Sequence, residues 1–173
     1  MLIIATNNPG KFERYKTFLS EMETVQKPAL HIEEGANGRE NAERKARAYR
    51  EAYGLPTLGI DEELFVNFTE EQPGAYIRRI GKGQEVSDEQ LRNHYLSLIR
   101  KASPGKRTGR FHHNLCLALL SGEIYAAFYD EPLVFTHNPS ASWKRGYPLS
   151  SLIIGRAALE GLQKVVKDLV RNV

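Results

Sequence analysis

The first eleven residues constrain the fold more than any other part of this chain. A short apolar run, Leu2–Ala5, meets the polar turn Thr6–Gly10, and a charged, periodic stretch begins at Lys11. The apolar run predicts a buried strand, and the stretch from Lys11 to Glu21 predicts a helix. This order places the N-terminus of a helix at the end of a buried strand.

The same segment is a candidate anion-binding loop. The first N–H groups of a helix and the positive end of its dipole favour a negatively charged group. Thr6 and Asn8 add side-chain donors, and Lys11 adds a positive charge in the first turn. The spacing of a Walker A loop is absent. A helix that is simply capped by Asn8 is the alternative, and the segment alone leaves both open.

Length and composition indicate a single domain, expected to span residues 1–173. Hydrophobic residues make up 41% of the chain and charged residues 26%, as in ordinary globular proteins. The single cysteine, Cys116, lies in an apolar run and is expected in the core. No apolar run approaches the roughly 20 residues of a membrane span, and the N-terminus lacks a signal-peptide pattern. We therefore expect a cytoplasmic protein without a membrane partner.

The net charge of +3 suits a small polyanionic ligand and is too weak to indicate a nucleic-acid partner. Mixed strands and helices along the rest of the chain predict an α/β fold with some antiparallel pairs. The predicted helices cover 11–21, 39–53, 88–102 and 155–173. The predicted strands cover 2–5, 29–33, 57–60, 64–68, 110–120, 123–128 and 133–136, with a hairpin turn at Ser121–Gly122.

Two further groups of polar residues follow predicted strands, where α/β proteins usually build their sites. Glu33 and Glu34 precede a helix in which Asn41 and Lys45 share one face. Carboxylates near a lysine suit a site for Mg²⁺ and phosphate, although solvated Glu–Lys pairs are commoner. Asp61 follows another predicted strand, where an acid binds metal, activates a water or only caps a loop.

Together these residues resemble the inosine triphosphate pyrophosphatase family, which hydrolyses noncanonical purine nucleoside triphosphates. The family's T-x-N-x-x-K motif is present as Thr6, Asn8 and Lys11. Its other motifs match E-N-A-x-x-K-A at 40–46, G-L-P at 54–56, P-G-x-Y at 73–76 with Arg79, and R-x-x-R-F at 107–111. Their order and spacing agree over about two thirds of the chain.

The resemblance implies a long twisted mixed sheet flanked by helices, two lobes with a central cleft, and a homodimer. It also implies Mg²⁺-dependent hydrolysis of a nucleoside triphosphate to the monophosphate and pyrophosphate. Glu33 or Glu34 would hold the metal together with Asp61, which would also orient the attacking water. The residues expected to bind the phosphates are Thr6, Asn8, Lys11, Asn41 and Lys45, with Lys11 and Lys45 also stabilising charge during catalysis.

Two departures from the family's pattern leave the function open. Glu62 and Glu63 stand where the family has Ser-Gly, and they either bind metal or repel the substrate. The family's later purine-reading motif is missing. In its absence, Trp143 or Tyr147 is the candidate to stack on a base, and Arg156 is a candidate to meet phosphate.

There are two alternatives to hydrolysis, and these departures favour the first. One is a degenerate relative that binds a nucleotide or another phosphate ligand without hydrolysing it. The other keeps only the scaffold and uses it for protein association.

Overall fold

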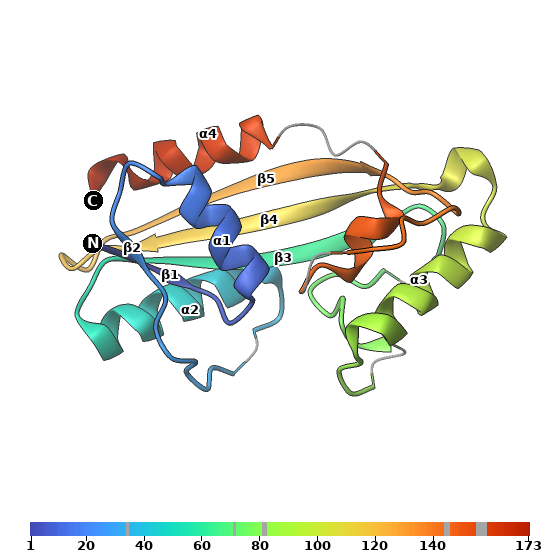
Figure 1. The fold of residues 1–173 in the computed structure, drawn as a ribbon. Helices are drawn as coiled ribbons and strands as arrows, with labels where there is room; N and C mark the ends of the chain where they lie inside the picture. Colours follow the sequence, from blue (N-terminus) through green and yellow to red (C-terminus); the bar gives the residue numbers. More distant parts are fainter. Residues whose placement is uncertain (34, 71, 81–82, 144–145, 155–158) are drawn as a thin grey trace. The chain divides into compact units, whose positions relative to one another are not determined.

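The computed structural model describes residues 1–173 except 34, 71, 81–82, 144–145 and 155–158 (Figure 1). Within the described residues, five strands form one sheet in the order β2-β1-β3-β4-β5, accompanied by four α-helices. Strand β1 pairs in parallel with β2 and with β3. Strands β4 and β5 are consecutive neighbours joined by the predicted tight turn, so they pair antiparallel. The predicted α/β class, a mixed sheet flanked by helices, is therefore confirmed.

The elements have the following bounds. The strands are β1 (Leu2–Ala5), β2 (Thr24–Val25), β3 (Thr57–Val66), β4 (Thr108–Ala118) and β5 (Ile124–Val134). The helices are α1 (Pro9–Phe18), α2 (Gly38–Tyr53), α3 (Asp88–Lys101) and α4 (Glu160–Leu169). In the described part of the chain, short 3₁₀ helices include η2 (Pro104–Lys106), η3 (Pro148–Leu152) and η4 (Val170–Asn172).

Several predicted strands differ from those in the structure. The strand predicted at 29–33 is wrong, because the two residues of β2 pair with β1 and 29–33 have no regular structure. Strand β3 continues through the acidic residues that were expected to form a loop, and β5 joins two segments that were predicted separately. Charged residues interrupt an apolar pattern in the sequence, but a strand tolerates them where neighbouring elements supply partners.

The helices follow their local start and stop signals. Asn8 caps α1, Asn37 caps α2, and α2 ends at Gly54 with φ 62°. Ser87 and Gln90 form the reciprocal capping pair that starts α3. Helix α1 ends at Phe18, three residues before its predicted end. The C-terminal helix was predicted from residue 155; α4 begins at Glu160, and 155–158 lie outside the described residues.

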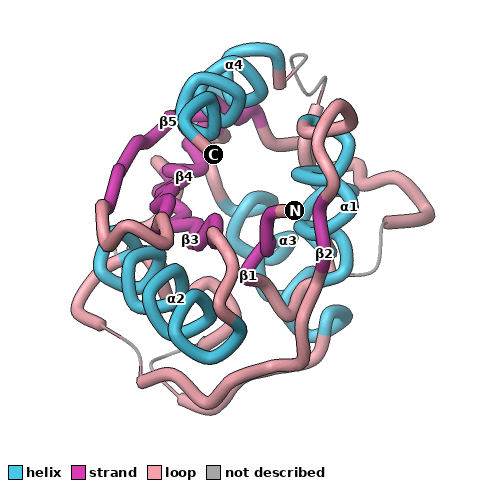
Figure 2. Tube along the Cα trace, turned by 90° about the vertical axis from the view of Figure 1, so that its left-hand side faces the viewer, coloured by secondary structure: helices cyan, strands magenta, loops and turns pink. Residues whose placement is uncertain are grey.

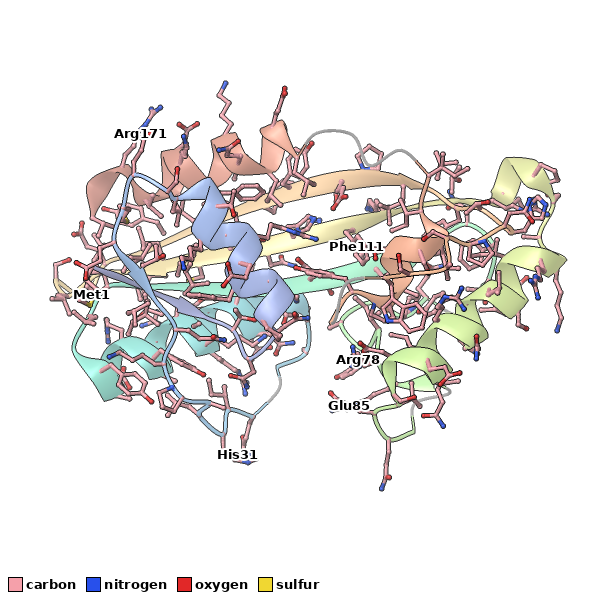
Figure 3. All side chains as sticks on the ribbon, in the orientation of Figure 1. Met1, His31, Arg78, Glu85, Phe111 and Arg171 are labelled. Atoms are coloured by element: carbon pink, nitrogen blue, oxygen red, sulfur yellow. The ribbon has the colours of Figure 1, made fainter. Side chains whose placement is uncertain are left out.

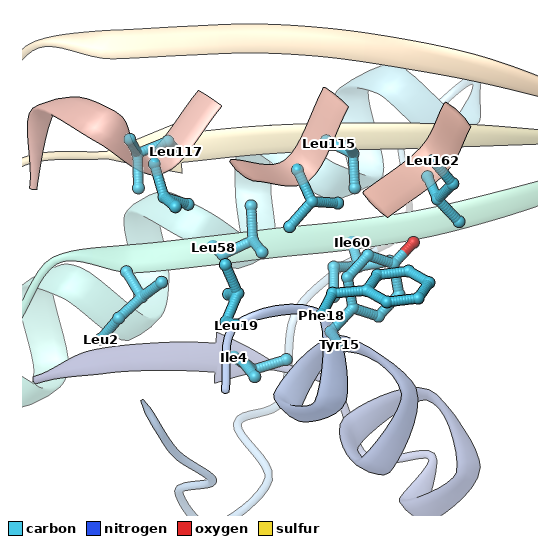
Figure 4. Close-up of a cluster of buried hydrophobic side chains, with 12 residues drawn as sticks. Leu2, Ile4, Tyr15, Phe18, Leu19, Leu58, Ile60, Leu115, Leu117 and Leu162 are labelled. Atoms are coloured by element: carbon cyan, nitrogen blue, oxygen red, sulfur yellow. The ribbon is translucent and has the colours of Figure 1, made fainter. Parts of the chain in front are cut away.

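The chain divides into two compact units, and the first comprises Met1–Glu62, His113–Tyr129 and Leu159–Val173. Figure 2 shows α1 and α4 on one face of its strands and α2 on the other. Alternate strand residues point to opposite faces, so Leu58 and Ile60 pack with Tyr15 of α1 and Leu162 of α4 (Figure 4). The opposite face packs small residues of α2 against the sheet.

Helix α2 approaches β3 very closely at Gly59. A Cβ atom at this position would collide with the backbone oxygen of Ala42 and lie 2.7 Å from the backbone nitrogen of Ala46. Because both atoms belong to the helix backbone, no side-chain rotation relieves the collision. The glycine therefore sets the distance at which α2 presents Asn41 and Lys45 toward β3.

We expect Gly59→Ala to lower the free energy of unfolding by about 1–3 kcal/mol, the usual cost of overpacking a close-packed contact. Chemical denaturation measures the change. Gly105→Ala is the matched control, because a Cβ there meets nothing within 4 Å. Equal stability of the Gly59→Ala variant and the unmodified protein would show that α2 does not depend on this close approach.

The second unit comprises Glu63–His112 and Asp130–Ala158. Its core gathers apolar side chains of α3, η3 and the strand segments, including Phe111 (Figure 3). Arg78 pairs with Asp88 in the first turn of α3 at 2.5 Å, and Arg92 of α3 donates a hydrogen bond to Ser151 of η3 at 3.0 Å. Helix α3 is thus tied at two points within its own unit.

Strands β3, β4 and β5 each contribute residues to both units. The expected single domain and the expected cleft between two lobes stay predictions. Cys116 is buried as predicted, and burial raises the pKa of its thiol to about 11. None of the helices in the described part of the chain has the length and apolar character needed to cross a membrane.

Candidate active site

Asp61 lies within β3 and not in a loop at a strand end, which corrects the prediction from the sequence. Successive strand residues point to opposite faces. Asp61 accordingly contacts residues of α2, whereas Glu62 contacts residues of α1. The two neighbouring acids therefore belong to two different clusters within the first unit.

The first cluster joins Asp61 to the two residues of α2 that were expected to share a face. The Lys45 Nζ atom lies 2.5 Å from Asp61 Oδ1 and also donates to the Ile60 carbonyl at 3.2 Å. The Asn41 amide nitrogen lies 3.4 Å from Asp61 Oδ2. On its other side, Asn41 Oδ1 accepts the Gly35 N–H at 2.5 Å. Asn41 and Lys45 were expected to share one face of the helix, and in the structure both contact Asp61, a contact that the sequence did not predict.

Burial makes this carboxylate different from one on the surface. The Asp61 side chain is 12% exposed and the Lys45 side chain 31% exposed. A partly buried carboxylate beside an ammonium and an amide is held in one orientation, and the partly exposed Lys45 side chain can be reached by a ligand. This arrangement can orient a water and bind a phosphate at neighbouring positions.

Several polar groups of the loop after β1 form hydrogen bonds with one another or with the start of α1. Asn8 Oδ1 accepts the N–H groups of Gly10 at 2.9 Å and Lys11 at 3.2 Å, so Asn8 caps α1. The Thr6 hydroxyl accepts the Asn8 N–H at 3.2 Å. The simple cap was the alternative interpretation of this segment, and it is present. Two N–H groups expected to face an anion are thus already bonded, and the Thr6 hydroxyl can still donate one hydrogen bond.

The second cluster surrounds Glu62 with three basic side chains. Its carboxylate lies 3.3 Å from Lys11 Nζ, 3.3 Å from an Arg14 guanidinium nitrogen, and 3.3 Å from His113 Nδ1. Glu62 is 5% exposed and His113 is fully buried. Lys11, expected to face a phosphate, is therefore paired with an acid of its own chain.

This cluster determines how Glu62 ionises. Burial alone would raise the pKa of the Glu62 carboxyl group. Attraction to Lys11, His113 and Arg14 outweighs burial, so the pKa lies well below its ordinary value of 4.5. Glu62 is thus a buried carboxylate that stays charged.

The lowered pKa predicts how stability depends on pH. Above pH 4.5 the carboxyl group is ionised in both the folded and the unfolded chain, and its stabilising contribution is fully present. As the pH falls below 4.5, the unfolded chain takes up this proton first, so stability is lost toward the lower folded-state pKa. Chemical denaturation at a series of pH values from 6 to 3 measures the free energy of unfolding. This free energy should fall more steeply for the unmodified protein than for Glu62→Gln. Parallel curves would contradict this assignment.

Three residues were expected to bind metal, and the structure describes two of them. Glu33 is exposed, and its carbonyl accepts a hydrogen bond from Arg44 at 3.2 Å. Glu34 lies outside the described residues. Among the residues that are described, no group of three or more His, Cys, Asp or Glu side chains is placed to hold a metal ion.

Asp61 nevertheless fits a magnesium site of the kind found in phosphate-processing proteins. There, Mg²⁺ is usually held by one or two carboxylates, waters and the substrate's own phosphate oxygens. Asp61 offers hard oxygen donors at a position next to a lysine. The chemistry of this donor set therefore suits Mg²⁺.

The candidates for contacting a base or a further phosphate lie in the C-terminal third. The Arg92 guanidinium lies over the Trp143 ring, 5.0 Å from its centroid. The Tyr147 carbonyl accepts a hydrogen bond from the Ser150 hydroxyl at 2.7 Å. Arg156 lies outside the described residues. The ligand roles of all three candidates stay predictions.

Arg14 and His113 were missed from the sequence. Arg14 follows Lys11 by three residues, which places both on one face of α1, and this spacing was the available signal. His113 had no such signal, because it reaches Glu62 from β4, 51 positions along the chain (113 − 62).

Comparison with known proteins assigns the chain to a family. The model of the Ham1 family matches residues 2–131. The chain belongs to the Ham1 family. The resemblance seen in the motifs of the first two thirds of the chain is thereby confirmed.

Similar Ham1 relatives are named dITP/XTP pyrophosphatase. The one from Vibrio parahaemolyticus is 31% identical over 122 residues, covering 67% of this chain and 60% of that protein. The one from Exiguobacterium is 36% identical over 129 residues, covering 70% of this chain and 64% of that protein. The matched part thus spans less than two thirds of the length of either relative.

A solved Ham1 structure shares the fold. The Staphylococcus aureus Ham1 protein superimposes with a TM-score of 0.67 at 20% identity, covering 95% of this chain and 90% of that one. At this identity the likeness shows the fold alone.

Proposed function

We propose that this Ham1 protein hydrolyses a noncanonical purine nucleoside triphosphate to the monophosphate and pyrophosphate, with Mg²⁺ as cofactor. The observation that carries the proposal is the buried Asp61 carboxylate held by Lys45 and Asn41. Relatives named dITP/XTP pyrophosphatase support the same class of reaction.

Residues of both clusters and of the loop after β1 have roles in this proposal. Asp61 orients the water that attacks the phosphoanhydride bond, because its carboxylate is fixed and can accept a proton from that water. Lys45 and Lys11 neutralise the negative charge of the phosphates as the bond breaks, and Asn41 keeps Asp61 in place. The Thr6 hydroxyl donates to a phosphate oxygen, and the Asn8 cap holds the loop in shape.

Mg²⁺, when bound, would neutralise phosphate charge and orient the phosphate oxygens. Asp61 is the proposed carboxylate ligand, with Glu33 or Glu34 as a second one. We further propose that the protein is a homodimer, as the motif resemblance implies, and that it is cytoplasmic, as expected from its composition. Light scattering after size-exclusion chromatography measures the oligomeric state.

A second candidate function is binding without hydrolysis. It is favoured by one observation, the pairing of Lys11 with Glu62, which occupies a cation that hydrolysis would use. Both candidate functions predict that the protein binds a nucleotide, but only the first predicts that it hydrolyses the nucleotide.

A panel of nucleoside triphosphates tests the proposal. Purified protein is incubated with dITP, XTP, ITP, ATP and GTP, with and without Mg²⁺, and released pyrophosphate is measured. We expect turnover of dITP or XTP that depends on Mg²⁺. Saturable nucleotide binding without pyrophosphate release would favour the second candidate, and the absence of binding would favour a role in protein association.

A further inference from the structure

Glu62 occupies a set of side chains that proteins commonly use to bind phosphate. Lysine, arginine and histidine converge on its carboxylate from α1 and β4, each at 3.3 Å. Lysine and arginine, and histidine when it is protonated, make strong hydrogen bonds to carboxylate and phosphate oxygens alike. The carboxylate of Glu62 therefore stands where an oxyanion of a ligand would otherwise be bound.

The three basic partners differ in how firmly they are held. Arg14 is 10% exposed and His113 is fully buried, whereas Lys11 is 17% exposed and lies in the first turn of α1, next to the Thr6–Asn8 loop. A lysine is a single charge on a flexible stem, whereas the planar arginine group is held in a fixed geometry. Lys11 is therefore the partner that can leave Glu62 and turn toward a ligand.

The remaining partners make this exchange possible. A buried carboxylate that loses all its partners is strongly destabilising. When Lys11 leaves, Arg14 and His113 still contact Glu62, so the carboxylate stays paired. Lys11 can thus leave Glu62 and bind a ligand while the buried carboxylate keeps its other partners.

We propose that Glu62 is a specificity-determining residue that competes with phosphate for Lys11 and so weakens the binding of short phosphate anions, in particular pyrophosphate. The inference rests on the proposed function, in which Lys11 binds the phosphate tail. A nucleoside triphosphate gains contacts along its length and displaces Glu62 from Lys11. Pyrophosphate has fewer contacts to offset the competition, so Glu62 favours its release after the reaction.

The test is titration calorimetry of sodium pyrophosphate without any divalent cation. Glu62→Gln keeps the size of the side chain and removes its charge, so we expect pyrophosphate to bind about tenfold to a hundredfold more tightly, the range of one charge-assisted contact. Glu13→Gln is the matched control, because it removes the same charge from an exposed position on α1. We expect the control to change the affinity little.

A double variant shows whether Lys11 carries the effect. In the Glu62→Gln background, Lys11→Met should abolish the gain, because the freed cation is then missing. A gain that survives Lys11→Met would contradict the proposed competition. If Glu62→Gln does not fold, Glu62→Asp withdraws the carboxylate by one carbon, and the folded variant should show a smaller gain.

Unchanged or weaker pyrophosphate binding by folded Glu62→Gln or Glu62→Asp overturns the inference. If the variant binds pyrophosphate more weakly and its turnover of nucleotides no longer depends on Mg²⁺, Glu62 is instead a metal ligand. If the unmodified protein hydrolyses nucleotides in that case, the proposed function stands without the inference. If the variant gains pyrophosphate affinity while the unmodified protein never releases pyrophosphate from nucleotides, the competition for Lys11 stands, and both hydrolysis and the role of Glu62 in product release are excluded.

Discussion

Asp61→Asn is expected to lower the turnover of dITP or XTP by at least about a hundredfold, the low end of the contribution of a positioned acid or base. Asparagine has the shape of aspartate but no charge, so it can neither accept a proton from the attacking water nor attract Lys45. The Lys45 side chain is 31% exposed, so water can solvate its ammonium in the variant and the fold should persist. Pyrophosphate release measures turnover, and circular dichroism checks the fold.

Asp130→Asn is the control for this variant. Asp130 is also a strand acid with basic partners, since it pairs with Arg110 at 3.3 Å and His112 at 2.7 Å, but it belongs to the second unit. Its replacement should leave turnover near that of the unmodified protein. A folded Asp61→Asn protein with unchanged turnover would remove Asp61 from catalysis.

Lys11→Ala is expected to weaken nucleoside triphosphate binding about tenfold to a hundredfold, because one charge-assisted contact to a phosphate is lost. Calorimetry with ITP in the absence of divalent cation measures binding without turnover. Lys16→Ala is the matched control, since it removes an exposed lysine of the same helix.

The variant Lys45→Ala, measured in the same way, tests where the phosphates bind. If both lysines contact the phosphate tail, Lys45→Ala should weaken binding to a similar extent. A loss confined to Lys45→Ala would place the phosphates beside α2 and exclude Lys11. No loss in either variant would contradict the proposed phosphate site.

The contacts of Glu62 in the structure change the interpretation of the two glutamates that follow Asp61. From the sequence, Glu62 either binds metal or repels the substrate. Its contacts with Lys11, Arg14 and His113 add a third role, as a competitor within the protein. Glu63 is half-buried in the same strand, and its role stays open.

The sequence by itself determined where helices α1 to α4 lie, although the ends of α1 and α4 differ, and it contained the motifs that were expected to bind phosphate. Gly54 marks the end of α2 and Ser87 the start of α3 correctly, because a cap depends on hydrogen bonds to residues a few positions away. The shared face of Asn41 and Lys45 likewise follows from the helical repeat.

Only the tertiary structure decided how the acids of β3 are used. Charged residues are costly inside a strand unless other segments supply partners, and those partners come from α2 for Asp61 and from α1 and β4 for Glu62. The pleat then turns the two neighbouring carboxylates to opposite faces. These contacts join segments far apart in the chain, so no local pattern shows that Lys45 meets Asp61 while Lys11 meets Glu62.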